Sequence, residues 1–389
     1  MNDHLAQQDS WITRAAGWAL AFALGTGAVA SGGAPPERGG EPPEIVWQTL
    51  GVAQGLPTEK VFSIVTDGDR VWAGTEKGLA LVEEGKVSRV YGVADGLPYP
   101  VITALAMSRP GGDLWIGTMG GLARFSGGRI DAYTQLSSGL ANDVVYGVAC
   151  DGPVVWAATA AGLSRFDTRK GTWDIFDTSN SLMHEPWCYG VTAAQGQVYV
   201  AVWGGGVVIR DEKTGRFREH RDPDGEPEID LFRNDGLMHD VTSTISVSGR
   251  LMWVGTYFGL SRYDGRRWGT WNQDDSPIAG NFVIFIKALG DAVWIGTDRG
   301  VSRFDSVTWQ TWRRLEDPTK NEYRFTGADG KTAVMPAATG PAHNTVYGID
   351  FAGDEVWLAT AAGLSHGVPA TRQSHAESRV IKQARGERQ

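Results

Sequence analysis

The sequence has 389 residues, of which 42% are apolar, and its formal net charge is −9. A chain of this length and apolar content can bury a large core. The negative charge argues against nucleic acid as a partner, because phosphate binding needs a basic surface.

Residues 1–30 predict a signal peptide or a signal anchor. Arg14 precedes an apolar, alanine-rich run over residues 15–30 that ends in Ala28-Val29-Ala30, as a cleavage site does. The run is short for a membrane span, but charges of both signs precede it, so an uncleaved anchor stays open. Residues 31–43 are rich in Gly, Pro and Glu and predict a flexible linker. We therefore expect an exported protein, periplasmic or extracellular, that meets a membrane only through an uncleaved N-terminal segment.

One sequence pattern recurs seven times between residues 44 and 368. An aromatic residue in a β-branched run is followed by a glycine turn and a second short run, as in V-W-I-G-T-D-R-G-V-S-R-F from Val293. Most copies are about 40–45 residues apart and contain four strand-like runs, which is typical of a β-propeller blade. Helical repeats are excluded because no apolar series has helical spacing. The anchor aromatics of the copies are Trp72, Trp115, Trp156, Tyr199, Trp253, Trp294 and Trp357.

The repeats predict an all-β fold over residues 44–368, a single seven-bladed β-propeller of four-stranded blades. A glycine recurs inside the anchor strand, where it is otherwise unfavourable, and we interpret it as the site of a close approach by an aromatic side chain of the neighbouring blade. Residues 369–389 are polar and basic and predict a disordered tail. The glycines are Gly74, Gly117, Gly255 and Gly296.

The last copy lacks a fourth strand, because no aromatic-ending run follows Pro369. At the other end of the repeats, residues 45–50 form a strand-like run with no blade of its own. An unpaired edge on the seventh blade would expose hydrogen-bonding groups. We therefore predict that residues 45–50 complete the seventh blade and close the ring.

The repeated W-I-G-T-x-x-G-L-S-R-F motif resembles the two-component regulator propeller repeat. That family forms seven-bladed propellers, commonly the extracytoplasmic sensing part of histidine kinases. The resemblance covers roughly residues 44–368. It implies a sensor-type binding domain, although the sequence shows no kinase, receiver or DNA-binding segment beside the repeats.

Two cysteines in an exported chain raise the question of a disulfide. Cys150 lies late in the first strand of one repeat, and Cys188 lies early in the first strand of the next. Alignment of the repeats places them about five residues out of register, or roughly 17 Å along the strand. A disulfide needs Cα atoms within about 7 Å, so we predict two free thiols.

Ligand-binding residues are expected where loops of all seven blades surround the mouth of the channel. These are the loops that lead into the first strand of each blade and the loops that join its second and third strands. Three of the seven histidines align there beside carboxylates and amides. The aromatics Trp203, Tyr257 and Phe258 could stack on an apolar or sugar-like ligand or pack between blades. The predicted site residues are Glu59, Tyr99, Asn142, Asp143, His184, Glu185, Trp203, His239, Asp240, Tyr257, Asn281, Arg299, His343 and Asn344.

No nucleophile, zinc-protease or phosphate-loop motif occurs in the sequence. We expect no cofactor, while the aligned histidines leave a divalent metal open. The preferred interpretation is a monomeric, non-catalytic envelope propeller that binds a small molecule or a protein partner at the channel mouth. The alternatives are a lyase- or hydrolase-type enzyme with a His/carboxylate site, as in streptogramin lyase, and a scaffold of an envelope complex. A scaffold would use two insertions, at residues 217–235 and 313–341.

Overall fold

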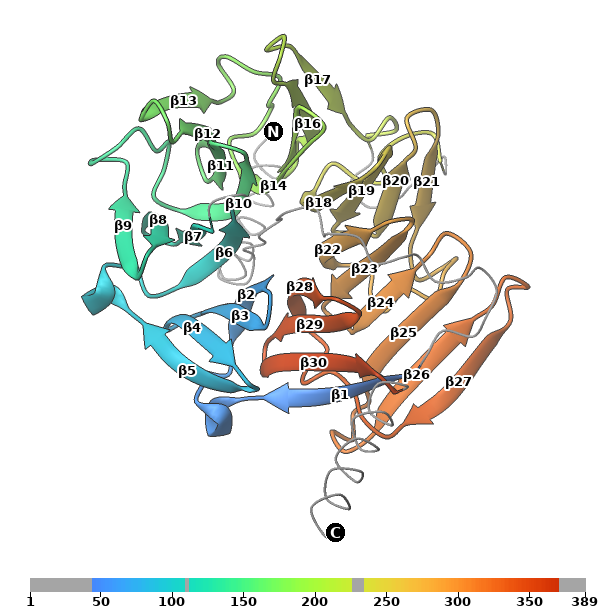
Figure 1. Cartoon of the computed structure of the whole chain (residues 1–389). Coiled ribbons are helices and arrows are strands. Elements are labelled where there is room, and N and C mark those ends of the chain that lie inside the picture. The colour runs from blue at the N-terminus through green and yellow to red at the C-terminus, as the bar shows by residue number, and fades with distance from the viewer. Residues whose placement is uncertain (1–43, 109–111, 226–233, 371–389) are drawn as a thin grey trace, which may run out of the picture.

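The computed structural model describes residues 44–108, 112–225 and 234–370. Within these residues the chain forms seven antiparallel sheets, arranged as blades around a central axis (Figure 1). The predicted all-β, seven-bladed propeller is thereby confirmed. The predicted signal segment (1–30), the linker (31–43) and nearly all of the predicted tail lie outside the described residues. No helix in the described ranges is both long and apolar enough to cross a bilayer.

In each blade, consecutive strands lie side by side from the channel outwards. Blade 1 consists of β2 (Val61–Asp67), β3 (Arg70–Thr75), β4 (Gly78–Glu83) and β5 (Lys86–Tyr91). Blade 2 consists of β6 (Ile102–Met107), β7 (Leu114–Thr118), β8 (Gly121–Ser126) and β9 (Arg129–Tyr133). Blade 3 consists of β10 (Val145–Asp151), β11 (Val154–Thr159), β12 (Gly162–Asp167) and β13 (Thr172–Phe176). Blade 4 consists of β14 (Cys188–Ala194), β15 (Gln197–Val202), β16 (Gly206–Asp211) and β17 (Phe217–His220).

The remaining blades vary this plan. Blade 5 consists of β18 (Thr242–Ser248), β19 (Leu251–Thr256), β20 (Leu260–Tyr263) and β21 (Trp268–Trp271). Blade 6 consists of β22 (Val283–Leu289), β23 (Ala292–Thr297), β24 (Val301–Phe304), β25 (Trp309–Arg314), β26 (Asn321–Thr326) and β27 (Thr332–Ala337). Blade 7 consists of β28 (Val346–Ala352), β29 (Glu355–Thr360), β30 (Gly363–Pro369) and β1 (Ile45–Leu50). Two short 3₁₀ helices follow fourth strands, η2 (Val52–Gln54) and η3 (Val93–Asp95).

The ring is closed by the strand that the sequence predicted for this role. β1 pairs antiparallel with β30 over its whole length, from Ile45 opposite Pro369 to Leu50 opposite Leu364. Pro369, which the sequence assigned to the tail, thus lies in a strand. Trp47 of β1 is only 4% exposed, so the closing strand contributes a core side chain as well as backbone pairing.

Blade 6 differs from the predicted four strands, because the second predicted insertion folds into β26 and β27 and widens this blade to six strands. Thr339, which follows β27, and Trp312 of β25 contact the closing strand. The Trp47 N–H donates to Thr339 Oγ1 at 2.9 Å, and the Trp312 ring lies between those of Trp47 (5.9 Å) and Tyr323 (5.4 Å). The insertion therefore covers the outer edge of β1.

The alternating strand directions give the propeller two faces. The mouth face carries the loops that lead into the innermost strands and the loops that join second to third strands. The opposite face, called the turn face below, carries the remaining hairpins. Because Ile45 pairs with Pro369 at the turn-face ends of β1 and β30, the described chain enters and leaves the ring on the turn face.

The core consists of clusters between neighbouring blades, for example Trp72 with Leu105 and Ile116. The anchor-strand glycines make close approaches, as predicted, but the neighbour is aliphatic and not aromatic. A Cβ at Gly74 would lie 2.5 Å from Ile102 Cγ2, and one at Gly255 would lie 2.6 Å from Val283 Cγ1. At these glycines, the first residue of the innermost strand in the neighbouring blade therefore fills the place that the missing side chain leaves open.

Both cysteines are free thiols. Cys188 is fully buried, with its Sγ 3.4 Å from Met183 Sδ. Burial raises the pKa of both thiols, which keeps them in the neutral form.

Candidate functional site at the channel mouth

A threonine and a glycine shape the mouth loop that joins the second and third strands. In blade 1, Thr75 Oγ1 donates to the Gly78 carbonyl at 2.7 Å and accepts the Lys77 N–H at 3.1 Å. Gly78 has a φ of 118°, and a Cβ there would lie 2.4 Å from the Tyr91 carbonyl oxygen. Only glycine suits this turn, which explains the recurrent T-x-x-G of the repeat.

The serine of the L-S-R-F segment holds the other mouth loop, which leads into the innermost strand. Ser164 Oγ accepts the Ala141 N–H at 3.0 Å, and Ser365 Oγ accepts the Ala342 N–H at 2.8 Å. Both serines are fully buried. The buried serine of the repeat thus holds in place the loop that leads into the innermost strand.

The two mouth loops of a blade are joined by a backbone hydrogen bond, which brings two side chains per blade to the channel rim. The Trp203 N–H donates to the Trp187 carbonyl at 2.9 Å, and the Tyr257 N–H donates to the Val241 carbonyl at 3.0 Å. We call the resulting ring the collar. By this pairing and the aligned positions, its members in blade order are Lys60 and Glu76, Val101 and Met119, Val144 and Ala160, Trp187 and Trp203, Val241 and Tyr257, Phe282 and Asp298, and Thr345 and Ala361.

The collar is chemically two-sided. Blades 2 to 5 contribute only apolar or aromatic members, and Phe282 of blade 6 extends this apolar arc. The polar members lie together on blades 6, 7 and 1, where the Lys60 Nζ and a Glu76 carboxylate oxygen are 4.0 Å apart. Such an arrangement suits a ligand with one apolar side and hydrogen-bonding groups on the other.

Aromatic rings follow one another along the apolar arc. The ring centroids of Tyr189 and Trp203 are 4.8 Å apart, those of Trp203 and Tyr257 are 6.5 Å apart, and those of Tyr257 and Phe282 are 4.8 Å apart. Tyr257 is 43% exposed and Trp187 is 38% exposed. Large aromatic side chains that stay half in solvent at a channel mouth mark a candidate binding surface.

Buried aromatics support the arc from below. The rings of Tyr146 and Tyr189 are stacked with centroids 4.5 Å apart and planes inclined by 5°, and both are 7% exposed. Burial raises the pKa of each tyrosine, so both remain neutral. The arc therefore rests on buried, stacked side chains of the innermost strands.

Two of the three predicted histidines have a local structural role. His239 Nδ1 accepts the Val241 N–H at 2.8 Å, and His343 Nδ1 accepts the Thr345 N–H at 2.9 Å. Asn142 makes the same contact in blade 3, where its Oδ1 accepts the Val144 N–H at 2.9 Å. The imidazoles therefore act as asparagine does in turns, and their Nδ1 lone pairs are already used.

The surroundings of these two imidazoles are also ordinary for structural side chains. The His239 ring is 6% exposed and lies 4.6 Å from the Phe258 ring. The His343 side chain is exposed to solvent on one side, and partial desolvation, together with the charge of Arg314, lowers its pKa. The third histidine, His184, is exposed and contacts the Glu219 carboxylate at 3.0 Å through Nε2. In the described ranges, no three His, Cys, Asp or Glu side chains are grouped so as to hold a metal ion.

Four further predicted residues tie the lead-in loops to the ends of outer strands. Their side-chain oxygens accept backbone N–H groups of the preceding blade, three of them two residues after its last strand and one, that of Arg314, at the end of β25. The bonds are Gln135 N–H to Asp143 at 2.6 Å, Asp222 N–H to Asp240 at 2.8 Å, Gln273 N–H to Asn281 at 2.7 Å, and Arg314 N–H to Asn344 at 2.7 Å.

The remaining predicted residues lie on the mouth face outside the collar or at its rim. Tyr99 is 44% exposed and lies over Gly120. Glu185 is exposed beside Gly204. Val61 of blade 1 and Ile102 of blade 2 occupy the same register position, because each pairs with the threonine that ends the second strand. The blade 1 counterpart of Tyr99 is therefore Thr58, so the sequence alignment that chose Glu59 was one residue out of register.

Arg299 lies next to the polar collar member Asp298. The Arg299 Nε lies 3.7 Å from Asp298, and burial raises the pKa of Asp298.

Sequence reasoning missed Trp187, Phe282 and the buried tyrosines. Their position one residue before, or one residue inside, the innermost strand was the available signal.

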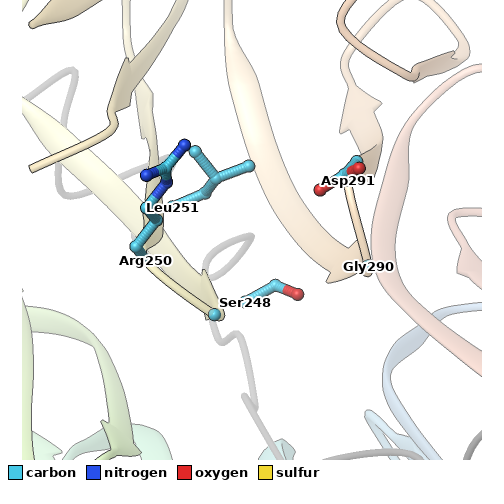
Figure 2. A pocket seen from close by; sticks show the side chains of 6 residues that line it. Ser248, Arg250, Leu251, Gly290 and Asp291 are labelled. Atoms are coloured by element: carbon cyan, nitrogen blue, oxygen red, sulfur yellow. The ribbon is translucent and has the colours of Figure 1, made fainter.

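The turn face also has a hollow of about 260 Å³, between the innermost turns of blades 5 and 6. Figure 2 shows Arg250 on one turn and Asp291 on the other. Both residues are exposed, and the residues that line the hollow include two glycines and no aromatic side chain. The mouth face is therefore the stronger candidate.

No protein-family model matches the sequence, and no curated protein matches it. Solved structures are similar in fold. They include the extracellular domain of a hybrid two-component system from B. thetaiotaomicron, with a TM-score of 0.64 and 17% identity over 84% of this chain and 42% of that one. Virginiamycin B lyase from Staphylococcus aureus has a TM-score of 0.57 and 15% identity, over 83% of this chain and 99% of that one. BamB from Moraxella catarrhalis has a TM-score of 0.51 and 15% identity, over 83% and 97%.

These likenesses concern the propeller fold alone, because all three proteins are less than 25% identical to this chain. The chain spans less than half the length of the first of them.

Proposed function

We propose that this chain is a non-catalytic, exported binding propeller that takes a ring-bearing ligand on the apolar arc of its collar. The observation that carries the proposal is the run of partly exposed aromatics from Trp187 and Trp203 through Tyr257 to Phe282. A planar or flat apolar group gains about 0.5–1.5 kcal/mol per aromatic contact beyond the area that it buries. The polar members on blades 6, 7 and 1 would orient the ligand.

Two further observations support a sensor-type role in the cell envelope. The N-terminal sequence predicts export, and the neighbours from B. thetaiotaomicron are extracellular domains of signalling proteins. A protein partner with an exposed aromatic side chain would use the same arc. The use of His239 and His343 as backbone acceptors weighs against the lyase-type alternative.

A thermal-shift screen of ring-bearing compounds tests the proposal. We expect stabilising compounds whose effect is lost in the Trp203→Ala/Tyr257→Ala variant and is unchanged by a chelator. The matched control is Ile175→Ala, because Ile175 is 40% exposed on an outer strand away from the mouth. Stabilisation that survives in the double variant, or that disappears with the chelator, would contradict the proposed site.

A further inference from the structure

A second hollow lies between blades 1 and 2, on a different side of the molecule from the collar. Its volume is about 280 Å³, and its walls include Trp72, Leu81, Tyr91 and Phe125. Asp67 and Arg70 form its rim on a turn-face hairpin, and three glycines of blade 2 leave the opening wide. Nothing in the proposed function uses this place.

The internal repeats show what fills the same place elsewhere. In blade 2, Trp115 lies opposite Arg124 in the strand register, and the guanidinium carbon of Arg124 is 5.9 Å from the Trp115 ring centroid. In blade 5, Trp253 lies opposite Arg262 at 5.5 Å. In blade 1, the residue opposite Trp72 is Leu81.

The aromatic walls of the three blades match closely. Trp72, Tyr91 and Phe125 have ring centroids 5.0–5.9 Å apart. The corresponding triad of blade 2 has centroids 5.4–6.0 Å apart, and that of blade 5 has centroids 5.0–6.1 Å apart. Blade 1 thus keeps the aromatic surface but has Leu81 at the arginine position opposite Trp72. The guanidinium of Arg89 lies over the Tyr91 ring of this surface, 4.3 Å from its centroid, and not over Trp72. A cation over such a surface is attracted by the ring quadrupole.

The segment that follows β30 carries suitable cations. β30 ends at Pro369 on the turn face, in the blade next to blade 1. Residues 371–389 contain Arg372, Arg379, Lys382, Arg385 and Arg388 against Glu377 and Glu387. The innermost turns of the turn face carry mostly the opposite charge, at Asp67, Asp69, Asp151, Asp291 and Asp354 against Arg70 and Arg250.

The segment is also long enough to reach the hollow. At about 3.3 Å per residue, the segment spans roughly 60 Å when extended. The hollow between blades 1 and 2 is about two sheet spacings of roughly 10 Å from blade 7.

We propose that residues 371–389 dock on the turn face and place one arginine guanidinium over Trp72, in the hollow that Leu81 leaves open. Asp67 supplies the carboxylate from the neighbouring strand. In blade 2 the carboxylate is that of Asp113, 2.6 Å from Arg124 and at the register position that Arg70 has in blade 1. Arg70, which already contacts Asp67, is the competing cation at the rim.

Trypsin cleavage of the full chain measures the docking at each arginine. Trypsin must bind the arginine side chain, so a docked arginine is cut only when it leaves the hollow. We expect one arginine of residues 371–389 to be cut about fivefold more slowly, or slower still, than in a free peptide of the same sequence. Added ethylguanidinium, as a free competitor, should abolish the difference.

Three variants test the place. Leu81→Arg supplies the missing guanidinium within blade 1 and should restore cleavage to the free-peptide rate, whereas Val90→Arg adds the same charge on the exposed side of β5 and should not. Asp67→Asn should weaken the protection, and Arg70→Ala should strengthen it. Equal cleavage of chain and peptide would overturn the proposal, and so would protection that persists in the Leu81→Arg variant. If the Leu81→Arg variant does not fold, the competitor decides. Slow trypsin cleavage of the natural chain that added ethylguanidinium does not speed up would overturn the proposal.

Discussion

Removal of the Trp47 side chain should weaken the closure of the ring more than removal of an exposed tryptophan. Trp47 is 4% exposed, contacts Trp312 edge to face, and belongs to the strand that joins the two ends of the described chain. Truncation of a buried aromatic side chain to alanine costs about 3–5 kcal/mol. For a domain of this size, that corresponds to a fall of roughly 5–10 °C in the melting temperature.

The matched control is Trp187→Ala, which removes the same side chain from a position that is 38% exposed and should cost less than about 1 kcal/mol. A second variant, Thr339→Val, removes the acceptor of the Trp47 N–H and should cost about 1–3 kcal/mol. Circular dichroism during heating and urea unfolding would measure all three. Equal melting temperatures for Trp47→Ala and Trp187→Ala would refute the role of β1 in closure.

Three other predictions concern single positions. Gly255→Ala should lower the free energy of unfolding in urea by about 1–3 kcal/mol, because the new Cβ would lie 2.6 Å from Val283 Cγ1. Adding Val283→Ala should recover part of the lost stability. No recovery would contradict the explanation. Burial raises the pKa of Asp222 to about 7 from 3.8, so the ionised carboxylate destabilises the native state increasingly between these pH values. The stability gained by Asp222→Asn should therefore grow from pH 4 to pH 7 and then level off. A stability gain independent of pH would refute this. Partial desolvation and the charge of Arg314 lower the pKa of His343, so its share of stability is present above pH 6.5 and is lost as the pH falls below it. His343→Asn should keep the bond from Thr345 and remove this loss. An asparagine variant as unstable as His343→Ala would show that the bond does not matter.

Most of the fold could be predicted because each blade repeats the same local requirements. The T-x-x-G turn, the aromatic anchor and the missing fourth strand after Pro369 are all local signals, and the last of them predicted the pairing of β1 with β30. The hairpin of β26 and β27 was missed because it carries no copy of the repeat. β26 pairs with β25, and β27 pairs with β26, as regular antiparallel strands. Nothing in their sequence distinguishes them from a loop insertion of the same length.

The candidate site could be placed on the correct kind of loop, but its chemistry could not be predicted in full. The alignment of His239 and His343 was visible in the sequence, whereas their Nδ1 acceptor roles depend on backbone geometry two residues further on. The two-sided collar depends on which loop residues are joined by a hydrogen bond, as Trp203 is to Trp187. Such pairs are more than ten residues apart in the chain, so periodicity alone does not reveal them.

The binding of 1-anilinonaphthalene-8-sulfonate tests the central claim most directly, because its fluorescence rises when its rings leave water for an apolar surface. In a titration of the folded full chain, we predict one saturable site whose affinity falls about tenfold or more in the Trp203→Ala/Tyr257→Ala variant and is unchanged in Ile175→Ala. The same affinity in the natural chain and in the double variant would contradict the claim that the apolar arc of the collar is the binding surface.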